Sequence, residues 1–166
     1  IECGGKHAIA RFSHARYSVG EHSQWEIASL TKAFVAILTL HAVKSGLLSL
    51  EAKVTKFLRT LQPDGDIPTI RDLLAFGVEF DLQHLKSPYT HRNDGSVMSA
   101  DELWEEIVNA RLRVSGFRYS NYATFILSRV LESVFNTSVE ELARRIILDP
   151  LGLEDTTFRS EDIMPN

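Results

Sequence analysis

The strongest constraint on the fold is an apolar segment near the N-terminus. Residues 33–43 read AFVAILTLHAV, in which only Thr39 and His41 are polar. A helix that is apolar on nearly every side must be buried on nearly every side. Gly46 follows this segment as a left-handed helix stop. The sequence therefore predicts a central core helix over 28–46.

Two shorter helices are expected from their capping residues. Thr69 precedes IRDLLAF, and Ser99 precedes ADELWEEIVNARL, which carries acidic residues in its first turn. A hydroxyl side chain before an apolar helical pattern accepts hydrogen bonds from the free N–H groups of the first turn. Between these helices, the polar stretch 86–97 contains Gly and Pro and is expected to be an exposed loop.

The C-terminal part of the chain repeats the helical period twice. Residues 119–135 and 137–148 both show it, and Thr137 is the expected cap of the second helix. Asp149 and Pro150 are expected to break the chain after that helix, because proline has no N–H group to continue it.

The strand signal is confined to the N-terminal region. Residues 6–20 carry short, alternating apolar positions, which favours one or two strands. Together with the helices, this predicts an α+β fold that is mostly helical. We expect one domain over 1–166, with the strands in 1–25 and the helical part in 26–166.

Composition narrows the range of functions. The formal net charge is -4, and the Lys and Arg residues are scattered, so the chain lacks the basic surface that binds nucleic acid. Cys3 is the only cysteine, and the six histidines form no His-Glu-x-x-His pattern, so we expect neither a metal nor another cofactor. No run reaches about 18 apolar residues, so no membrane span is expected.

A candidate nucleophile lies at the start of the core helix. In IASLTKAF, Ser29 and Lys32 stand three residues apart, a spacing that brings both side chains to one helix face. A serine hydroxyl needs a base to take its proton, and burial can make a lysine amine that base by disfavouring its charged form. The helix N-terminus offers N–H groups to a developing oxyanion, so the pair suits acyl transfer. The alternative is a capping serine beside a solvated lysine.

A second motif stands before a later apolar helix. FRYSNYA places Tyr119 and Asn121 two residues apart. A tyrosinate held near a lysine can act as a general base, and the asparagine amide can hold a substrate amide and the lysine. The alternative is a tyrosine buried with its hydroxyl hydrogen-bonded and an asparagine that caps the helix.

In this order, these motifs resemble the serine β-lactamase and penicillin-binding-protein superfamily, particularly its class C, D-Ala-D-Ala carboxypeptidase and esterase branch. The resemblance implies a β-lactamase/transpeptidase-like fold in which Ser29 is the acylated nucleophile, Lys32 its activating partner, Tyr119 the general base and Asn121 a substrate-orienting amide. The Ser29 N–H would then form half of the oxyanion hole, and the location would be periplasmic or secreted. Four ordered blocks carry the resemblance: IASLTKAFVAILTLHAVKSGLLSLEAKVTKFL, IPTIRDLL, FRYSNYATFILSRVLESVF and LARRIILDPLGLEDTTF.

Two features depart from the pattern of that superfamily. Members commonly continue IPTIRDLL with His-Thr-Ser-Gly, whereas this chain reads AFGVEFDL, with Phe76 where the histidine is expected. The third motif, Lys-Thr-Gly or His-x-Gly, lies on a strand downstream of the DTTF block, and the chain ends at Asn166. We therefore expect a C-terminal half or a second chain to supply the remaining strands, and the core helix to leave an apolar face uncovered.

The expected function is that of a serine hydrolase that forms an acyl-enzyme on Ser29 and acts on an amide or ester bond. A β-lactam, a D-Ala-D-Ala peptide and a simple ester all remain open as substrates. The alternative is a catalytically silent homologue that acts as a binding or regulatory module. A third interpretation, an unrelated helical interaction domain, predicts that the four candidate side chains lie far apart.

Overall fold

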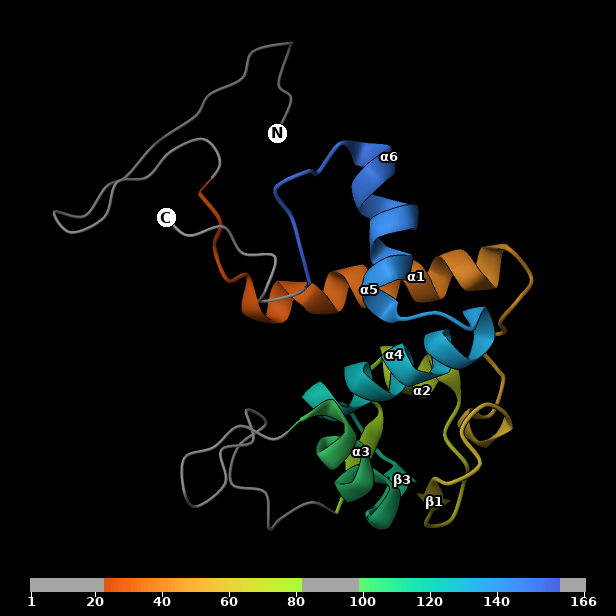
Figure 1. Ribbon diagram of the computed structural model, residues 1–166. Helices are drawn as coiled ribbons and strands as arrows, with labels where there is room; N and C mark the ends of the chain where they lie inside the picture. Colours follow the sequence, from red (N-terminus) through yellow and green to blue (C-terminus); the bar gives the residue numbers. More distant parts are fainter. Residues whose placement is uncertain (1–22, 82–98, 159–166) are drawn as a thin grey trace, which may run out of the picture.

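The computed structural model describes residues 23–81 and 99–158. Helices make up most of this part, with a small sheet at one end (Figure 1). The strands expected within 6–20 and the loop expected at 86–97 lie outside the described residues. In chain order the elements are η1 (Ala28–Leu30), α1 (Thr31–Lys44), η2 (Val54–Lys56), β1 (Gln62–Pro63), α2 (Ile70–Leu74), β2 (Val78–Phe80), α3 (Ala100–Asn109), β3 (Arg111–Val114), α4 (Asn121–Phe135), α5 (Val139–Ala143), η3 (Arg144–Leu148) and α6 (Asp149–Leu151).

Helix α1 is the core helix that the apolar segment predicts. It follows η1, a single 3₁₀ turn, and Gly46 ends it with a φ of 72°, a conformation that glycine adopts at little cost. One side of α1 packs against α4 and α5, so Leu38 and Ala42 on that side are fully buried. This contact anchors η1 to the rest of the molecule.

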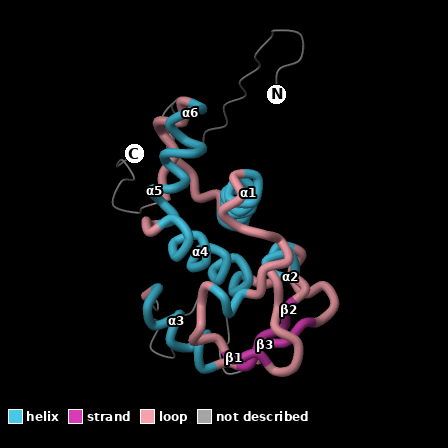
Figure 2. The backbone as a smooth tube through the Cα atoms, turned by 90° about the vertical axis from the view of Figure 1, so that its right-hand side faces the viewer, coloured by secondary structure: helices cyan, strands magenta, loops and turns pink. Residues whose placement is uncertain are grey.

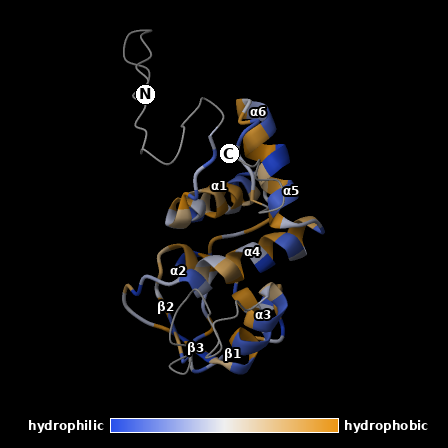
Figure 3. Ribbon diagram, turned by 60° about the vertical axis from the view of Figure 1, so that its left-hand side comes forward, coloured by the Kyte–Doolittle hydropathy of each residue, from blue (hydrophilic) through white to orange (hydrophobic). Residues whose placement is uncertain are grey.

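The opposite side of α1 is open, and apolar segments along the helix are visible in Figure 3. Leu30 is 67% exposed, and Ile37 and Leu40 are each 51% exposed. Leu30 and Ile37 are seven positions apart and Ile37 and Leu40 are three apart, and both spacings place residues on one helix face. The prediction that this helix is buried on nearly every side is therefore wrong for the described residues. The prediction that it leaves an apolar face uncovered is confirmed.

Helix α4 crosses the middle of the molecule, with α1 on one side and α3 and the sheet on the other (Figures 1 and 2). It packs against α1, α2 and α5. Its buried residues recur at the three- and four-residue spacing of an amphipathic helix. They are Ala123, Ile126, Leu127, Val130 and Leu131.

The sheet has three short strands in the order β1-β3-β2, with β3 parallel to β1 and antiparallel to β2. The sequence pattern extends the preceding helix to Leu112, but α3 ends at Asn109 and β3 begins at Arg111. Only Leu112 is buried in this four-residue strand, so alternation is too short to identify it from the sequence. Pairing with β2, which includes the Glu79 and Arg113 register pair, stabilises it as a strand.

The helix caps agree only partly with the sequence predictions. Thr69 and Ser99 cap α2 and α3 as expected, and each forms a capping box with the acidic residue three positions later. The cap of α5 is Ser138, which accepts a hydrogen bond from the Glu141 N–H, so the prediction of Thr137 is wrong.

The prediction of a chain break at Asp149 and Pro150 is also wrong. Both residues belong to the short helix α6, which has its proline in the first turn. The helical backbone continues from η3 through Asp149, where φ is -59° and ψ is -48°, and proline, whose φ is fixed at about -65°, fits that conformation. The chain turns at Gly152 instead, where φ is 65°.

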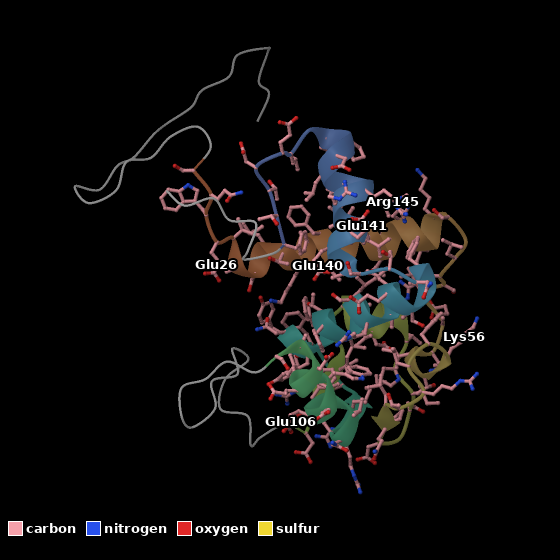
Figure 4. The ribbon with its side chains drawn as sticks, in the orientation of Figure 1. Glu26, Lys56, Glu106, Glu140, Glu141 and Arg145 are labelled. Carbon is pink, nitrogen blue, oxygen red and sulfur yellow. The ribbon has the colours of Figure 1, made fainter. Side chains whose placement is uncertain are left out.

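Charged side chains are spread over many elements of the fold. Figure 4 labels Glu26 before α1, Lys56 at the end of η2 and Glu106 on α3, which lie on separate parts of the molecule. Among the described residues, no group of three or more His, Cys, Asp or Glu side chains could hold a metal ion. In the same part of the chain, every helix is too short or too polar to span a membrane.

Candidate active site

Ser29 lies in the middle of η1, one turn before α1. The preceding residue, Ala28, has a φ of 45°, in the left-handed region that side-chain-bearing residues seldom adopt. The Leu30 N–H donates to the Ile27 carbonyl at 3.0 Å and closes the turn. Ile27 and Leu30 occupy the N-cap positions of η1 and α1, and neither helix has a side-chain cap. Ser29 is therefore not a capping serine.

Two side chains donate hydrogen bonds to the Ser29 hydroxyl. The Lys32 Nζ donates to its Oγ at 3.1 Å, and the Tyr119 phenol donates to the same Oγ at 2.7 Å. The Lys32 Nζ also lies 4.8 Å from the centre of the Tyr119 ring. Lys32 therefore contacts both Ser29 and Tyr119 and is not simply a solvated lysine. The interpretation as an unrelated helical domain predicted that the candidate side chains lie far apart, and this is wrong for Ser29, Lys32 and Tyr119.

The segment between β3 and α4 carries Tyr119 to this position. The Ser115 N–H donates to the Gly77 carbonyl at 2.9 Å, and the Arg118 N–H donates to the Phe76 carbonyl at 2.7 Å. These two hydrogen bonds hold the segment beside the end of α2. The approach of Tyr119 to Ser29 therefore depends on how α2 ends.

Helix α2 ends in a Schellman motif. The Phe76 N–H donates to the Leu73 carbonyl at 3.2 Å, and the Gly77 N–H donates to the Asp72 carbonyl at 2.7 Å. Phe76 occupies the left-handed position of this motif with a φ of 54°. Glycine is the usual residue there, and a residue with a side chain costs about 1–2 kcal/mol more in that conformation.

The ring of Phe76 packs on the two aromatic side chains of residues 117–119, Phe117 and Tyr119. It lies 5.2 Å from the Tyr119 ring with an interplanar angle of 38°, and 6.1 Å from the Phe117 ring at 83°. Such offset and edge-to-face pairs are favourable beyond the area they bury. The sequence analysis assigned no role to Phe76. The only feature of the sequence that pointed to this residue was that it stands where the superfamily has a histidine.

The surroundings of Tyr119 favour its ionised form. The hydrogen bond from Lys32 is the largest cause that lowers the pKa of Tyr119 below 10.0, and the hydrogen bond with Ser29 lowers it further, while burial acts in the opposite direction. Tyr122, one helical turn further on, shows the contrast, because burial raises its pKa. A lower pKa increases the phenolate fraction near neutral pH, which a general base requires.

Asn121 is the first residue of α4, and its carbonyl Oδ1 is buried. The N-cap is Ser120, whose Oγ accepts from the Tyr122 N–H at 3.1 Å, so Asn121 is not the cap. Within the described residues Oδ1 accepts no hydrogen bond, from Ser29, Lys32 or any other group. The amide therefore keeps an unused acceptor two residues after Tyr119.

The chain on the N-terminal side of Ser29 is tied to the C-terminal part of the described chain. The Gln24 Nε2 donates to the Asp155 carbonyl at 2.8 Å. On α1, the ring of Phe34 meets Phe158 edge to face at 5.7 Å. Both contacts lie close in sequence to Ser29, and the sequence interpretation did not anticipate them.

Comparison with known proteins places this chain in a family context. A family model described as Beta-lactamase matches residues 5–165. The esterase EstB of Burkholderia gladioli is 30% identical over 158 residues, an alignment that takes in 86% of this chain and 40% of the esterase.

Solved structures show the same fold. The octameric penicillin-binding protein homologue from Pyrococcus abyssi superimposes with a TM-score of 0.68 at 27% identity, over 83% of this chain and 33% of that protein. The penicillin binding protein from Bacillus halodurans gives 0.67 at 25% identity, over 87% of this chain and 45% of that protein. This chain spans less than half the length of each of these relatives.

Proposed function

This chain belongs to the beta-lactamase family, and from that premise we propose that it is a serine hydrolase that forms an acyl-enzyme on Ser29. The observation that carries the proposal is the pair of hydrogen bonds that Lys32 and Tyr119 make to one serine hydroxyl. A hydroxyl, a phenol and an amine in mutual contact are the groups that acyl transfer by general base catalysis needs.

In the acylation step, the Tyr119 phenolate takes the proton of Ser29 as Oγ attacks the substrate carbonyl carbon. The 2.7 Å contact serves both protonation states, because the serine hydroxyl donates across it when the phenol is ionised. The C–O double bond opens to an oxyanion, for which we propose the Ser29 N–H as one donor. When the carbonyl reforms, the leaving group departs with the proton from Tyr119.

In the deacylation step, water attacks the acyl carbon and gives its proton to the Tyr119 phenolate. The Ser29 Oγ then leaves and takes that proton, which restores both groups. Throughout the cycle the positive charge of Lys32 favours the phenolate, in line with the lowered pKa of Tyr119. We assign the orientation of the substrate to Asn121, because it stands two residues after Tyr119 and its side-chain amide can both donate and accept hydrogen bonds.

The substrate contains an amide or ester bond, and a β-lactam, a D-Ala-D-Ala peptide and a simple ester all fit this chemistry. We also propose that further sequence, from a C-terminal half or a second chain, covers the open face of α1. That sequence would bring the third motif and the second oxyanion donor. Loss of one oxyanion donor slows acyl transfer by about 10²–10³, so residues 1–166, a partial domain, would be slow by themselves.

The alternative is a catalytically silent homologue that acts as a binding or regulatory module. The replacement of the superfamily histidine by Phe76 favours this alternative. It predicts that Ser29 is not acylated even when the remaining sequence is present.

A labelling experiment separates the two functions. The protein is treated with a fluorophosphonate or a labelled penicillin, in a chain extended past Asn166, and weighed by mass spectrometry. A hydrolase gives a covalent adduct that Ser29→Ala abolishes and Lys32→Ala reduces. No adduct in the extended chain would support the silent homologue instead.

A further inference from the structure

We propose that Phe76 is a positioning residue for the site: its ring and its backbone carbonyl together fix the place of the Tyr119 phenol against Ser29. The inference rests on the proposed function, because it concerns how the general base is held. It assigns a role to the residue at which this chain departs from the superfamily pattern.

Three consecutive residues contact Phe76. The Arg118 N–H donates to its carbonyl at 2.7 Å, while the rings of Phe117 and Tyr119 pack on its ring. The backbone hydrogen bond holds the segment 117–119 beside the end of α2. The two ring contacts restrict the orientation of the Phe117 and Tyr119 side chains. Together they determine where the phenol of Tyr119 points.

The exposure of Tyr119 makes such a partner necessary. Its side chain is 57% exposed, whereas Phe76 is half-buried and packs against the hydrophobic core. An exposed tyrosine samples several side-chain rotamers unless a neighbour restricts it. Phe76 connects Tyr119 to the packed hydrophobic core.

The backbone of Phe76 is a second, independent observation. Its left-handed conformation is one that glycine adopts freely and phenylalanine adopts at a cost. The Schellman motif by itself would be satisfied by glycine. The contact that glycine could not provide is the ring stack on Tyr119.

The matched control is the neighbouring aromatic pair. Phe80 on β2 and Tyr122 on α4 lie 5.7 Å apart at 63°, four and three positions after Phe76 and Tyr119 but outside the Ser29 contacts. If Phe76 served only to pack the core, Phe76→Leu and Phe80→Leu would have the same consequences.

The experiment measures the rate of Ser29 labelling and its pH midpoint in the complete protein. We expect Phe76→Leu to slow labelling about tenfold and to move the midpoint toward 10.0, the ordinary pKa of tyrosine. Phe76→Tyr should restore both values, since it retains the ring. Phe76→Gly should slow labelling like Phe76→Leu even though it relaxes the backbone, and Phe80→Leu should change neither value.

An unchanged rate and midpoint in Phe76→Leu would overturn the inference, and so would equal losses in Phe76→Leu and Phe80→Leu with the midpoint unmoved. If the wild-type protein gives no adduct at all, the proposed function fails and the inference is decided by spectroscopic titration. The pKa of Tyr119, obtained by difference against Tyr119→Phe, must then still rise in Phe76→Leu. An unchanged pKa would refute the positioning role.

Discussion

The phenol oxygen of Tyr119 lies 2.7 Å from the Oγ of Ser29, although the two residues are 90 positions apart in the chain. Ser29 is held by η1 at the head of α1, and Tyr119 by the connection from β3 to α4. The contact exists because α1 packs on α4 and because the end of α2 holds that connection. Activity should therefore depend on these supports as well as on the reacting groups.

Removal of the phenol oxygen should remove the base and leave the fold intact. We expect Tyr119→Phe to slow acylation of Ser29 by about 10²–10⁴, the usual contribution of a positioned general base. The Tyr119 side chain is more than half exposed, so thermal unfolding should be nearly unchanged. Tyr122→Phe is the control, because that hydroxyl lies outside the Ser29 contacts. Labelling of Tyr119→Phe at the wild-type rate would show that another group takes the proton.

The pH dependence of acylation should report the pKa of Tyr119. The base acts as the phenolate, so the rate rises as pH increases through that pKa, which lies below 10.0. Because Lys32 is the main cause of the lowering, Lys32→Met should move the rise to higher pH and reduce the rate near neutrality.

The control for Lys32 is Lys56→Met, since Lys56 also lies over an aromatic ring, that of Phe57 at 5.7 Å, but on another element. It should leave the pH–rate profile unchanged. If the rise stays in place in Lys32→Met, the lysine does not set the ionisation of the phenol.

The cap of α2 should matter to the site, whereas the cap of α3 should not. Thr69→Ala and Ser99→Ala each remove a capping box, which costs about 1 kcal/mol of unfolding free energy. Only α2 is followed by the Schellman motif that contains Phe76, so we expect slower acylation in Thr69→Ala alone. Urea denaturation gives the stabilities and mass spectrometry gives the rates. Equal acylation rates in the two variants would show that the stability of α2 does not affect the site.

Two leucines on α1 should differ sharply in their contribution to stability. Leu38 is fully buried and Leu40 is 51% exposed. In the 166-residue chain, Leu38→Ala should lower the unfolding free energy by about 2–5 kcal/mol, and Leu40→Ala by no more than about 0.5 kcal/mol. A large cost of Leu40→Ala in a longer chain, and not in this one, would show that the additional sequence covers the open face of α1. A small cost in both would contradict that proposal.

Several interactions between near neighbours in the chain were readable from the sequence, although the cap of α5 and the helix through Asp149 and Pro150 were not. The core helix, its stop at Gly46 and the caps Thr69 and Ser99 depend on a few adjacent residues, and the structure has them where the pattern predicts. The contact of Ser29 with Lys32 has the same origin, because three positions on a helical turn bring two side chains together.

Interactions between distant segments were decided only by the tertiary structure. β3 is a strand because β2 pairs with it, and one face of α1 stays open because nothing in the described residues covers it. The ring of Phe76 meets the ring of Tyr119, a residue some 40 positions further on. The physical reason is that helical periods and caps repeat within one or two turns, whereas pairing and packing depend on which surfaces meet. Contacts between distant segments leave no local pattern in a single sequence, so they cannot be read from it.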